Sequence, residues 1–311
     1  MVSFYVVAIA AALCCWAFQR LSIPRVDEDL ASEVILGLQH DGASQLPPVF
    51  GHRGGGLDAP ENTLAAFLEA KKNDAYGIEF DLSFTRDNVA VIFHDDTLER
   101  TTNGKGRLED TTFEDLRRLD ASCKHPLAQR FPAERVPTLK EAVEECLRLD
   151  MRLIIDVKEY DSRAVQVVDQ LFRERPELYR RALVASFYHN FVYALRRQNP
   201  GIVTALTWRP GVLTYEDMNN TQPRHDSRSV HQAARVADWL LDKALHTGFL
   251  PHLIGSSAVL ISTNILDAEY VHAWRNRGLH VIAWTSNHPA EKDFLRRSLR
   301  VPVITDTLRQ V

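Results

Sequence analysis

Short apolar runs alternate with amphipathic stretches through most of this chain of 311 residues. The runs are apolar at successive positions, as in parallel strands that are buried on both faces. They span residues 49–52, 77–82, 89–94, 153–157, 182–187, 202–207, 258–262, 280–284 and 301–304. Run 89–94 follows run 77–82 too closely for a helix between them, so we expect it to form a hairpin-like extension.

Helical patterns fill the intervals between these runs. Thr138 and Glu141 have the spacing of a capping box, and the residues that follow carry an apolar stripe of helical period. Further helices are expected at 61–73, 161–175, 189–198, 267–277 and 289–297. About eight strand-then-helix units predict an α/β fold of the (β/α)₈ TIM-barrel type. A doubly wound open sheet is the alternative, but no glycine-rich dinucleotide motif follows the first strand.

Two segments interrupt the alternation and are interpreted as insertions. Residues 95–137 are polar and contain an Asn-Gly pair and several prolines. Residues 209–257 are longer than one βα loop should be and include an amphipathic stretch at 230–245. That stretch is either an extra helix covering the barrel or a patch lying on a membrane.

The N-terminus differs from the rest of the chain, because no charged residue precedes Arg20. Residues 1–19 are predicted to form a transmembrane signal-anchor, with a cleaved signal peptide and a buried soluble helix as the alternatives. Residues 20–48 are interpreted as a polar linker, and residues 49–311 as the barrel domain. An N-X-T glycosylation sequon begins at Asn219, which places the barrel in the lumen of the secretory pathway or outside the cell if the sequon is used.

Composition excludes some classes of protein. The formal net charge is -4 and no basic run is large enough for a nucleic-acid partner. Four cysteines are too few for a disulfide scaffold, and Cys146 falls on the apolar stripe of a predicted helix, where we expect a core residue.

Charged residues stand at the ends of several apolar strands, the face on which barrels build active sites. Glu79 and Asp81 are two residues apart on one strand and therefore point to the same side. With Asp156 they supply three carboxylates, an oxygen-only set that suits Mg²⁺ or Ca²⁺. The alternative is a structural network in which these acids pair with Arg53 and Lys158.

Two histidines lie in the same strand-end strings. His52 and His94 are the natural proton carriers, since imidazole titrates near neutral pH. Arg53 and Lys158 would neutralise a phosphate, the first as a bidentate fork and the second as a point charge.

At these residues the sequence resembles the glycerophosphodiester phosphodiesterase family. The matching strings, in chain order, are HRGGGLDAPENTLAAF, GIEFDLSFTRDNVAVIFHDDTLERTTNGKG, VPTLKEAVE, LIIDVK, IAWTSN and VITDT. The resemblance covers roughly residues 49–306. The apolar N-terminus and the second insertion are similar to the membrane-anchored animal branch, which acts on glycerophosphoinositol.

The resemblance implies a role for each matching position. His52 and His94 would be the general acid and base, while Glu79, Asp81 and Asp156 would hold the divalent metal. Many family members have glutamate where this chain has Asp156. The remaining implied roles are phosphate binding by Arg53 and Lys158, site ordering by Glu61 and Asn62, and packing against the glycerol by Trp284.

The expected reaction is metal-dependent hydrolysis of a glycerophosphodiester to glycerol 3-phosphate and an alcohol, at the endoplasmic reticulum and secretory pathway or the plasma membrane. One alternative is a lysophospholipase D acting on lyso-N-acylethanolamine or other lysophospholipids. A non-catalytic membrane interaction protein is the alternative from another class. The intact set of histidines and acids argues against it.

Overall fold

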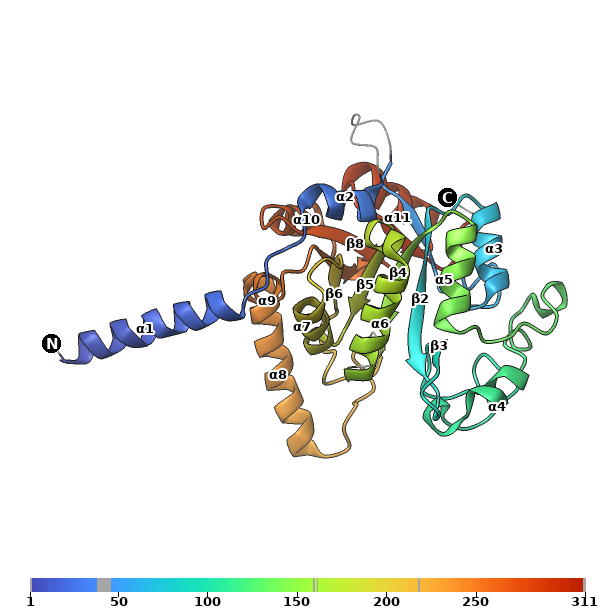
Figure 1. Cartoon of the computed structure of the whole chain (residues 1–311), viewed down its shortest axis with the longest axis horizontal. Coiled ribbons are helices and arrows are strands. Elements are labelled where there is room, and N and C mark those ends of the chain that lie inside the picture. The colour runs from blue at the N-terminus through green and yellow to red at the C-terminus, as the bar shows by residue number, and fades with distance from the viewer. Residues whose placement is uncertain (1, 38–45, 159, 161, 218, 310–311) are drawn as a thin grey trace.

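Eight parallel strands close into a barrel in the computed structural model, which describes residues 2–37, 46–158, 160, 162–217 and 219–309 (Figure 1). Closure is complete because β1 pairs with both β2 and β9. The barrel strands are β1 (Val49–His52), β2 (Gly77–Phe84), β4 (Arg152–Val157), β5 (Ala182–Ser186), β6 (Thr204–Trp208), β7 (Ala258–Ser262), β8 (His280–Trp284) and β9 (Val303–Thr305). The TIM-barrel prediction is confirmed, and the open doubly wound sheet is wrong.

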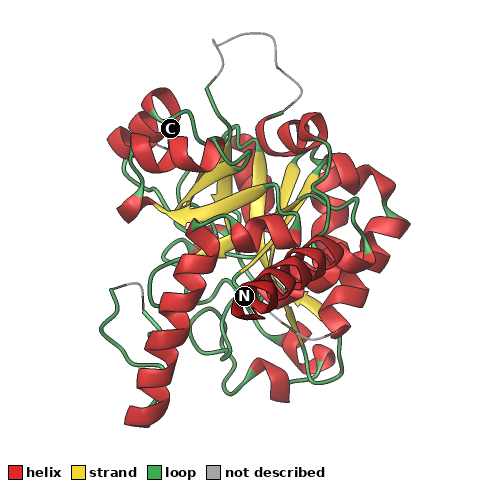
Figure 2. Cartoon of the chain, turned by 90° about the vertical axis from the view of Figure 1, so that its left-hand side faces the viewer, coloured by secondary structure: helices red, strands yellow, loops and turns green. Residues whose placement is uncertain are grey.

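Helices pack around the outside of the barrel between successive strands (Figure 2). They are α3 (Leu64–Lys72), α5 (Leu139–Arg148), α6 (Ser162–Glu174), α7 (His189–Gln198), α10 (Ala268–Arg275) and α11 (Pro289–Asp293), the last continued by a π-helical turn over Phe294–Ser298. The capping box at the start of α5 is present, with both the Thr138 and Glu141 bonds made. Cys146 is fully buried on this helix, as its apolar position indicates.

The first insertion builds a small cluster of its own beside the barrel. Strand β3 (Ala90–Ile92) pairs antiparallel with β2, which confirms the expected hairpin. The insertion also contains α4 (Phe113–Arg118) and the 3₁₀ turns Leu108–Asp110 and Ala128–Arg130. A separate apolar cluster joins this segment to β3 through Val91, Phe93, Leu98, Leu108, Leu116, Ala121 and Val136.

A helix closes the amino-terminal end of the barrel. Within the segment interpreted as a polar linker, Glu28–Leu36 form α2, which Asp27 caps by accepting two backbone N–H bonds. Its buried side chains Ala31, Val34 and Ile35 join the apolar cluster that fills the barrel interior. The part of the linker at 38–45 lies outside the described residues. Because α2 covers one end of the barrel, the described residues leave the barrel interior open only at the carboxyl ends of the strands. This end faces downward in Figure 1.

The second insertion contains two helices. The amphipathic stretch forms α8 (Arg228–His246), which runs beside the carboxyl end of the barrel, and α9 (Phe249–Ile254) follows it. At the N-terminus α1 (Val2–Leu21) extends away from the barrel (Figure 1). In the part of the chain that is described, no helix combines the length and the apolar character that crossing a membrane requires.

If α2 stabilises the barrel by filling its end, then Ile35→Ala should lower the free energy of unfolding by roughly 2–5 kcal/mol, the usual cost of truncating a buried isoleucine. Ile35 is 1% exposed, whereas its neighbour Leu36 is 37% exposed. Leu36→Ala should therefore change stability by only about 0.5 kcal/mol. Denaturant unfolding of both variants is the measurement, and equal losses would contradict a specific role for the buried face.

Candidate active site

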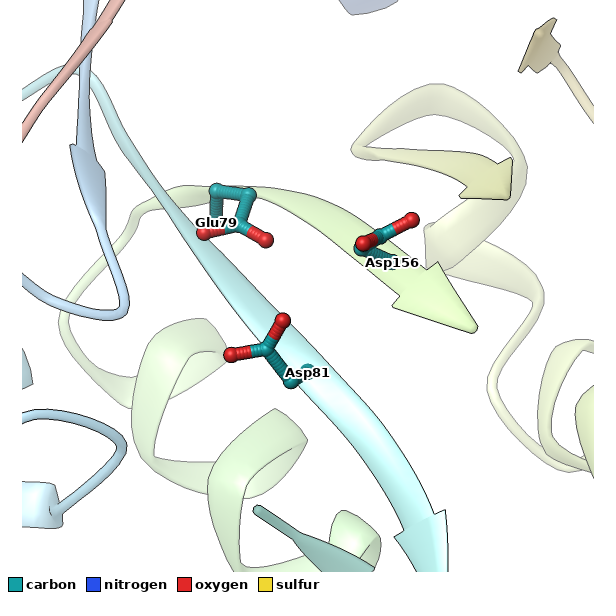
Figure 3. A group of neighbouring side chains, drawn as sticks. All are labelled: Glu79, Asp81 and Asp156. Atoms are coloured by element: carbon teal, nitrogen blue, oxygen red, sulfur yellow. The ribbon is translucent and has the colours of Figure 1, made fainter. Parts of the chain in front are cut away.

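Strand pleating places three carboxylates inside the barrel. On β2, Ile78, Phe80 and Leu82 point outward into the cluster under the helices, so the alternate residues Glu79 and Asp81 point inward. Asp156 on β4 is the register partner of Asp81. The three side chains converge on one point inside the barrel (Figure 3).

These carboxylates have the arrangement of an oxygen-only cation site. Each offers an oxygen, and the three oxygens lie within 4.8 Å of one another. Oδ1 of Asp156 is buried and has no hydrogen-bond partner among the described residues, and the buried Oδ1 of Asp81 has an ion pair with Lys158 Nζ. A buried carboxylate oxygen without a partner is costly, and a hard divalent cation held by the three acids would satisfy it. The residues present therefore fit the metal that the sequence predicts.

Two cations lie against the same acids. Lys158 Nζ is 2.5 Å from Asp156 Oδ2 and 3.0 Å from Asp81 Oδ1, and Arg53 Nε is 3.3 Å from Asp81 Oδ2. Burial alone would raise the pKa of Asp81, but Lys158 and Arg53 outweigh it and the pKa is lowered. Burial would lower the pKa of Lys158. The negative charges of Asp156 and Asp81 outweigh burial, so the pKa is raised.

Lys158 and Arg53 neutralise only part of the negative charge of the three acids, and the effect appears at Glu79. Burial, and next the negative charge of Asp81, raise the pKa of Glu79 to about 7. Its Oε2 accepts a hydrogen bond from the backbone N–H of Arg53 at 3.0 Å. A divalent cation at the cluster would favour the ionised form of Glu79 and complete the charge balance.

His52 is held by a residue that the sequence reasoning did not assign. Its Nδ1 lies 2.5 Å from Oδ1 of Asp306, and Asp306 Oδ2 accepts a bond from Asn287 Nδ2 at 2.7 Å. The Asp306 backbone N–H also donates to Asn287 Oδ1. Burial would lower the pKa of His52, but Glu79 and Asp306 raise it overall. Its other ring nitrogen, Nε2, lies 3.9 Å from Glu79.

His94 has a matching partner on its own chain segment. Its Nδ1 lies 2.6 Å from Asp95 Oδ1. Arg100 donates from Nε and Nη2 to Asp95 and from Nη1 and Nη2 to Glu61, so it joins the two carboxylates. Glu61 in turn accepts from Arg53 Nη1 at 2.8 Å. A continuous chain of ion pairs therefore connects His94 to Arg53.

The turn after β1 brings the remaining predicted residues inward. Gly54 has φ +86°, and a Cβ there would lie 2.7 Å from the Cβ of Ala66, so only glycine fits. Asn62, itself at φ +56°, donates from its backbone to Arg53 O and from Nδ2 to Asp81 Oδ2 at 2.8 Å. The turn and the start of α3 thus fix both Arg53 and Asp81.

Trp284 lies at the end of β8, where its ring packs edge-on against Phe187 with centroids 5.7 Å apart. Its buried Nε1 has no hydrogen-bond partner among the described side chains and backbone. Asn219 is exposed in the loop between β6 and α8, on an element that contributes none of the acids or histidines of the site.

The structure brings together His52, Arg53, Glu61, Asn62, Glu79, Asp81, His94, Asp156 and Lys158, which the sequence predicts as site residues. Their individual roles stay predictions. Sequence reasoning missed Asp306 and Arg100. Asp306 follows the last apolar strand, so the strand-end rule that identified Asp156 applies to it equally. Arg100 lies in a loop and carried no such signal.

Comparison with known proteins agrees with this geometry. The model of the glycerophosphoryl diester phosphodiesterase family matches residues 52–310. The chain belongs to this family. Glycerophosphodiester phosphodiesterase 1 of Mus musculus is 41% identical and that of Homo sapiens 40%, each over 257 residues that cover 83% of this chain and 77% of the relative.

Solved structures show the same barrel. A phosphodiesterase of Oleispira antarctica, in complex with the product sn-glycerol-3-phosphate, is 25% identical with a TM-score of 0.66 over 84% of this chain and 93% of the other. A structure from Silicibacter pomeroyi is 22% identical with a TM-score of 0.68, covering 90% and 95%. The expected family is therefore confirmed, and with it the expectation of an enzyme of the phosphoric diester hydrolase class.

Asp306→Asn tests whether this carboxylate orients and charges His52. The variant should lower the pKa of the His52 imidazole, since the charge of Asp306 raises it, and should lower kcat by less than the roughly 10²–10⁴-fold that a general acid or base supplies. Histidine NMR titration of the metal-free protein and initial-rate assays are the measurements. Asp96→Asn is the control, because Asp96 is exposed and its carboxylate makes no hydrogen bond or ion pair in the described structure. An unchanged His52 pKa would remove Asp306 from this role.

Proposed function

We propose that this protein hydrolyses glycerophosphodiesters such as glycerophosphoinositol to glycerol 3-phosphate and the head-group alcohol, with the help of a divalent metal. The observation that supports this most directly is the convergence of Glu79, Asp81 and Asp156 between two carboxylate-bound histidines. The family relationship supports the same reaction. Oxygen-only ligation favours Mg²⁺ or Ca²⁺ over a softer metal.

Each part of the site has a task in this reaction. When bound, the metal offsets the charge that grows on the phosphoryl oxygens. Arg53 and Lys158 bind the phosphate and add fixed positive charge near it. His52 and His94 form the acid–base pair: one removes the proton of the attacking hydroxyl and the other protonates the leaving alcohol. Because Asp306 and Asp95 each engage an Nδ1 atom, the Nε2 atoms stay available for proton transfer.

The deciding experiment measures glycerol 3-phosphate release from glycerophosphoinositol by the purified protein with Mg²⁺, with Ca²⁺ and with EDTA. We expect release with at least one metal and none with EDTA. Asp156→Ala should weaken the metal dependence, because it removes a third of the carboxylate set. Release that persists in EDTA would contradict the metal site, and a folded protein inactive with every metal would contradict the substrate.

Histidine variants test the acid–base pair. His52→Ala and His94→Ala should each lower kcat by about 10²–10⁴-fold while the protein stays folded. His272→Ala is the control, since His272 lies exposed on α10. Wild-type kcat in either site variant removes that histidine from the mechanism.

The alternatives gain less support. The comparisons favour a glycerophosphodiester substrate over the lysophospholipase D alternative. A non-catalytic interaction protein would not need the buried acids and the oriented histidines.

Membrane attachment through α1 belongs to the same proposal. Large apolar side chains along α1 are 52% to 65% exposed, which is unusual for a helix surrounded only by water. They are Tyr5, Val6, Val7, Ile9, Leu13, Trp16 and Leu21. We place the barrel on the lumenal or extracellular side, where the exposed Asn219 would be glycosylated.

Expression in a secretory cell line tests this placement. The wild-type protein should lose apparent mass on treatment with an N-glycosidase, and Asn219→Gln should not. A wild-type band that glycosidase leaves unchanged would contradict the use of this sequon.

A further inference from the structure

An open hollow of about 510 Å³ lies where α1 meets the barrel, away from the acidic cluster. Its lining comes from the end of α1, the segment after it, α9 and the end of α10: Gln19, Ser22, Ile23, Pro24, Arg25, His252 and Arg277. Phe18 of α1 stacks on Phe249 and His252 of α9, with ring centroids 4.8 Å and 5.5 Å apart. These contacts fix the root of α1 beside the hollow.

Two arginines at this hollow pair with no carboxylate of the described residues. Arg25 Nη1 donates to the backbone oxygens of Arg277 and Gly278, and Arg277 Nη1 donates to Ala273 O. Among the described residues neither forms an ion pair within 4.0 Å. Burial lowers the pKa of Arg25 and Glu28 only partly opposes this, since Glu28 pairs with His280 at 2.9 Å. The hollow therefore combines two guanidinium groups, a histidine and two neutral polar side chains, Gln19 and Ser22, without an acid.

The surroundings of the hollow are apolar on one side. The exposed apolar length of α1 leads directly to it, and the last turns of α1 carry Trp16 with Arg20 over its ring at 5.8 Å. An apolar helix that ends in tryptophan and arginine has the order of groups found at a membrane interface. A phosphate bound in the hollow would lie at the level where lipid head groups meet the tails beside α1.

We propose that this hollow binds the phosphate of an anionic lipid head group, with the acyl chains lying along α1. Arg25 and Arg277 supply the charge, and Gln19 and His252 supply hydrogen bonds. The site is distinct from the catalytic cluster, and it rests on the proposed attachment of α1 to a membrane. Free inorganic phosphate has the same recognition chemistry, so the test must separate the two sources.

Vesicle flotation of the full chain is the test, with phosphatidylcholine vesicles and with phosphatidylcholine vesicles that contain phosphatidic acid. The wild-type protein should partition more strongly to the second kind. Arg277→Gln should reduce that preference about fivefold, the usual effect of one basic side chain at an anionic surface. Arg25→Gln combined with Arg277→Gln should remove it almost completely.

A matched control separates a site from general surface charge. Lys105→Gln with Lys140→Gln removes two charges from exposed positions in the first insertion and on α5, and should leave the preference unchanged. An equal loss in this control, or no loss in the arginine variants, would overturn the proposal. Inorganic phosphate equimolar with the accessible phosphatidic acid, at constant ionic strength, should leave the preference unchanged, because the acyl chains along α1 strengthen binding of the lipid. If it removes the preference, the hollow takes free phosphate and the lipid assignment is wrong.

Hydrolysis of glycerophosphoinositol in solution is followed for every variant. The arginine variants should retain wild-type kcat, which shows that they fold. Loss of lipid preference with intact hydrolysis supports the lipid site alone, whereas absence of hydrolysis in the wild type bears only on the proposed reaction.

Discussion

Three carboxylates are buried inside this barrel with two fixed cations against them, and the rest of the site is arranged around that imbalance. Register sets Asp81 opposite Asp156, and pleating adds Glu79 on the same inner face. Isolated buried charges are very costly, so the arrangement persists only with nearby positive charge. Lys158 and Arg53 offset part of it, and burial together with the charge of Asp81 still raises the pKa of Glu79. A divalent cation held by the three acids would balance the remaining negative charge.

The need to neutralise the buried acids also explains why the two ends of the barrel differ from each other. The inner face near α2 is mostly apolar, from Phe50 and Ile154 to Ile304, and His280 at its edge pairs with Glu28 of α2. The three buried acids and the two site histidines lie toward the carboxyl ends of the strands. There each histidine engages a carboxylate, and those carboxylates are held by Asn287 and Arg100. The barrel thus confines its polar chemistry to one open end, where a phosphodiester can enter.

Sequence reasoning predicted the strands and most of the residues that the structure brings together, because both depend on local pattern. Buried parallel strands are continuously apolar, and a charge at such a strand's end stands out, as Glu79, Asp81 and Asp156 do. Sequence reasoning assigns α2 to a linker because the surface that α2 covers, the amino-terminal end of the barrel, exists only once eight distant strands have closed. Arg100 was missed for a similar reason: its two carboxylate partners, Glu61 and Asp95, meet only in three dimensions.

The direction of the Asp156 carboxylate is set by its neighbour two residues on. Lys158 donates to Oδ2 of Asp156, lies 3.0 Å from Oδ1 of Asp81, and leaves Oδ1 of Asp156 without a partner among the described residues. One ammonium group therefore fixes the carboxylates of both acids. If Lys158 orients the carboxylate of Asp156 as well as supplying positive charge, then the length of the Lys158 side chain matters as much as its charge. An arginine there would keep the charge but could not place it at the same point between Asp81 and Asp156.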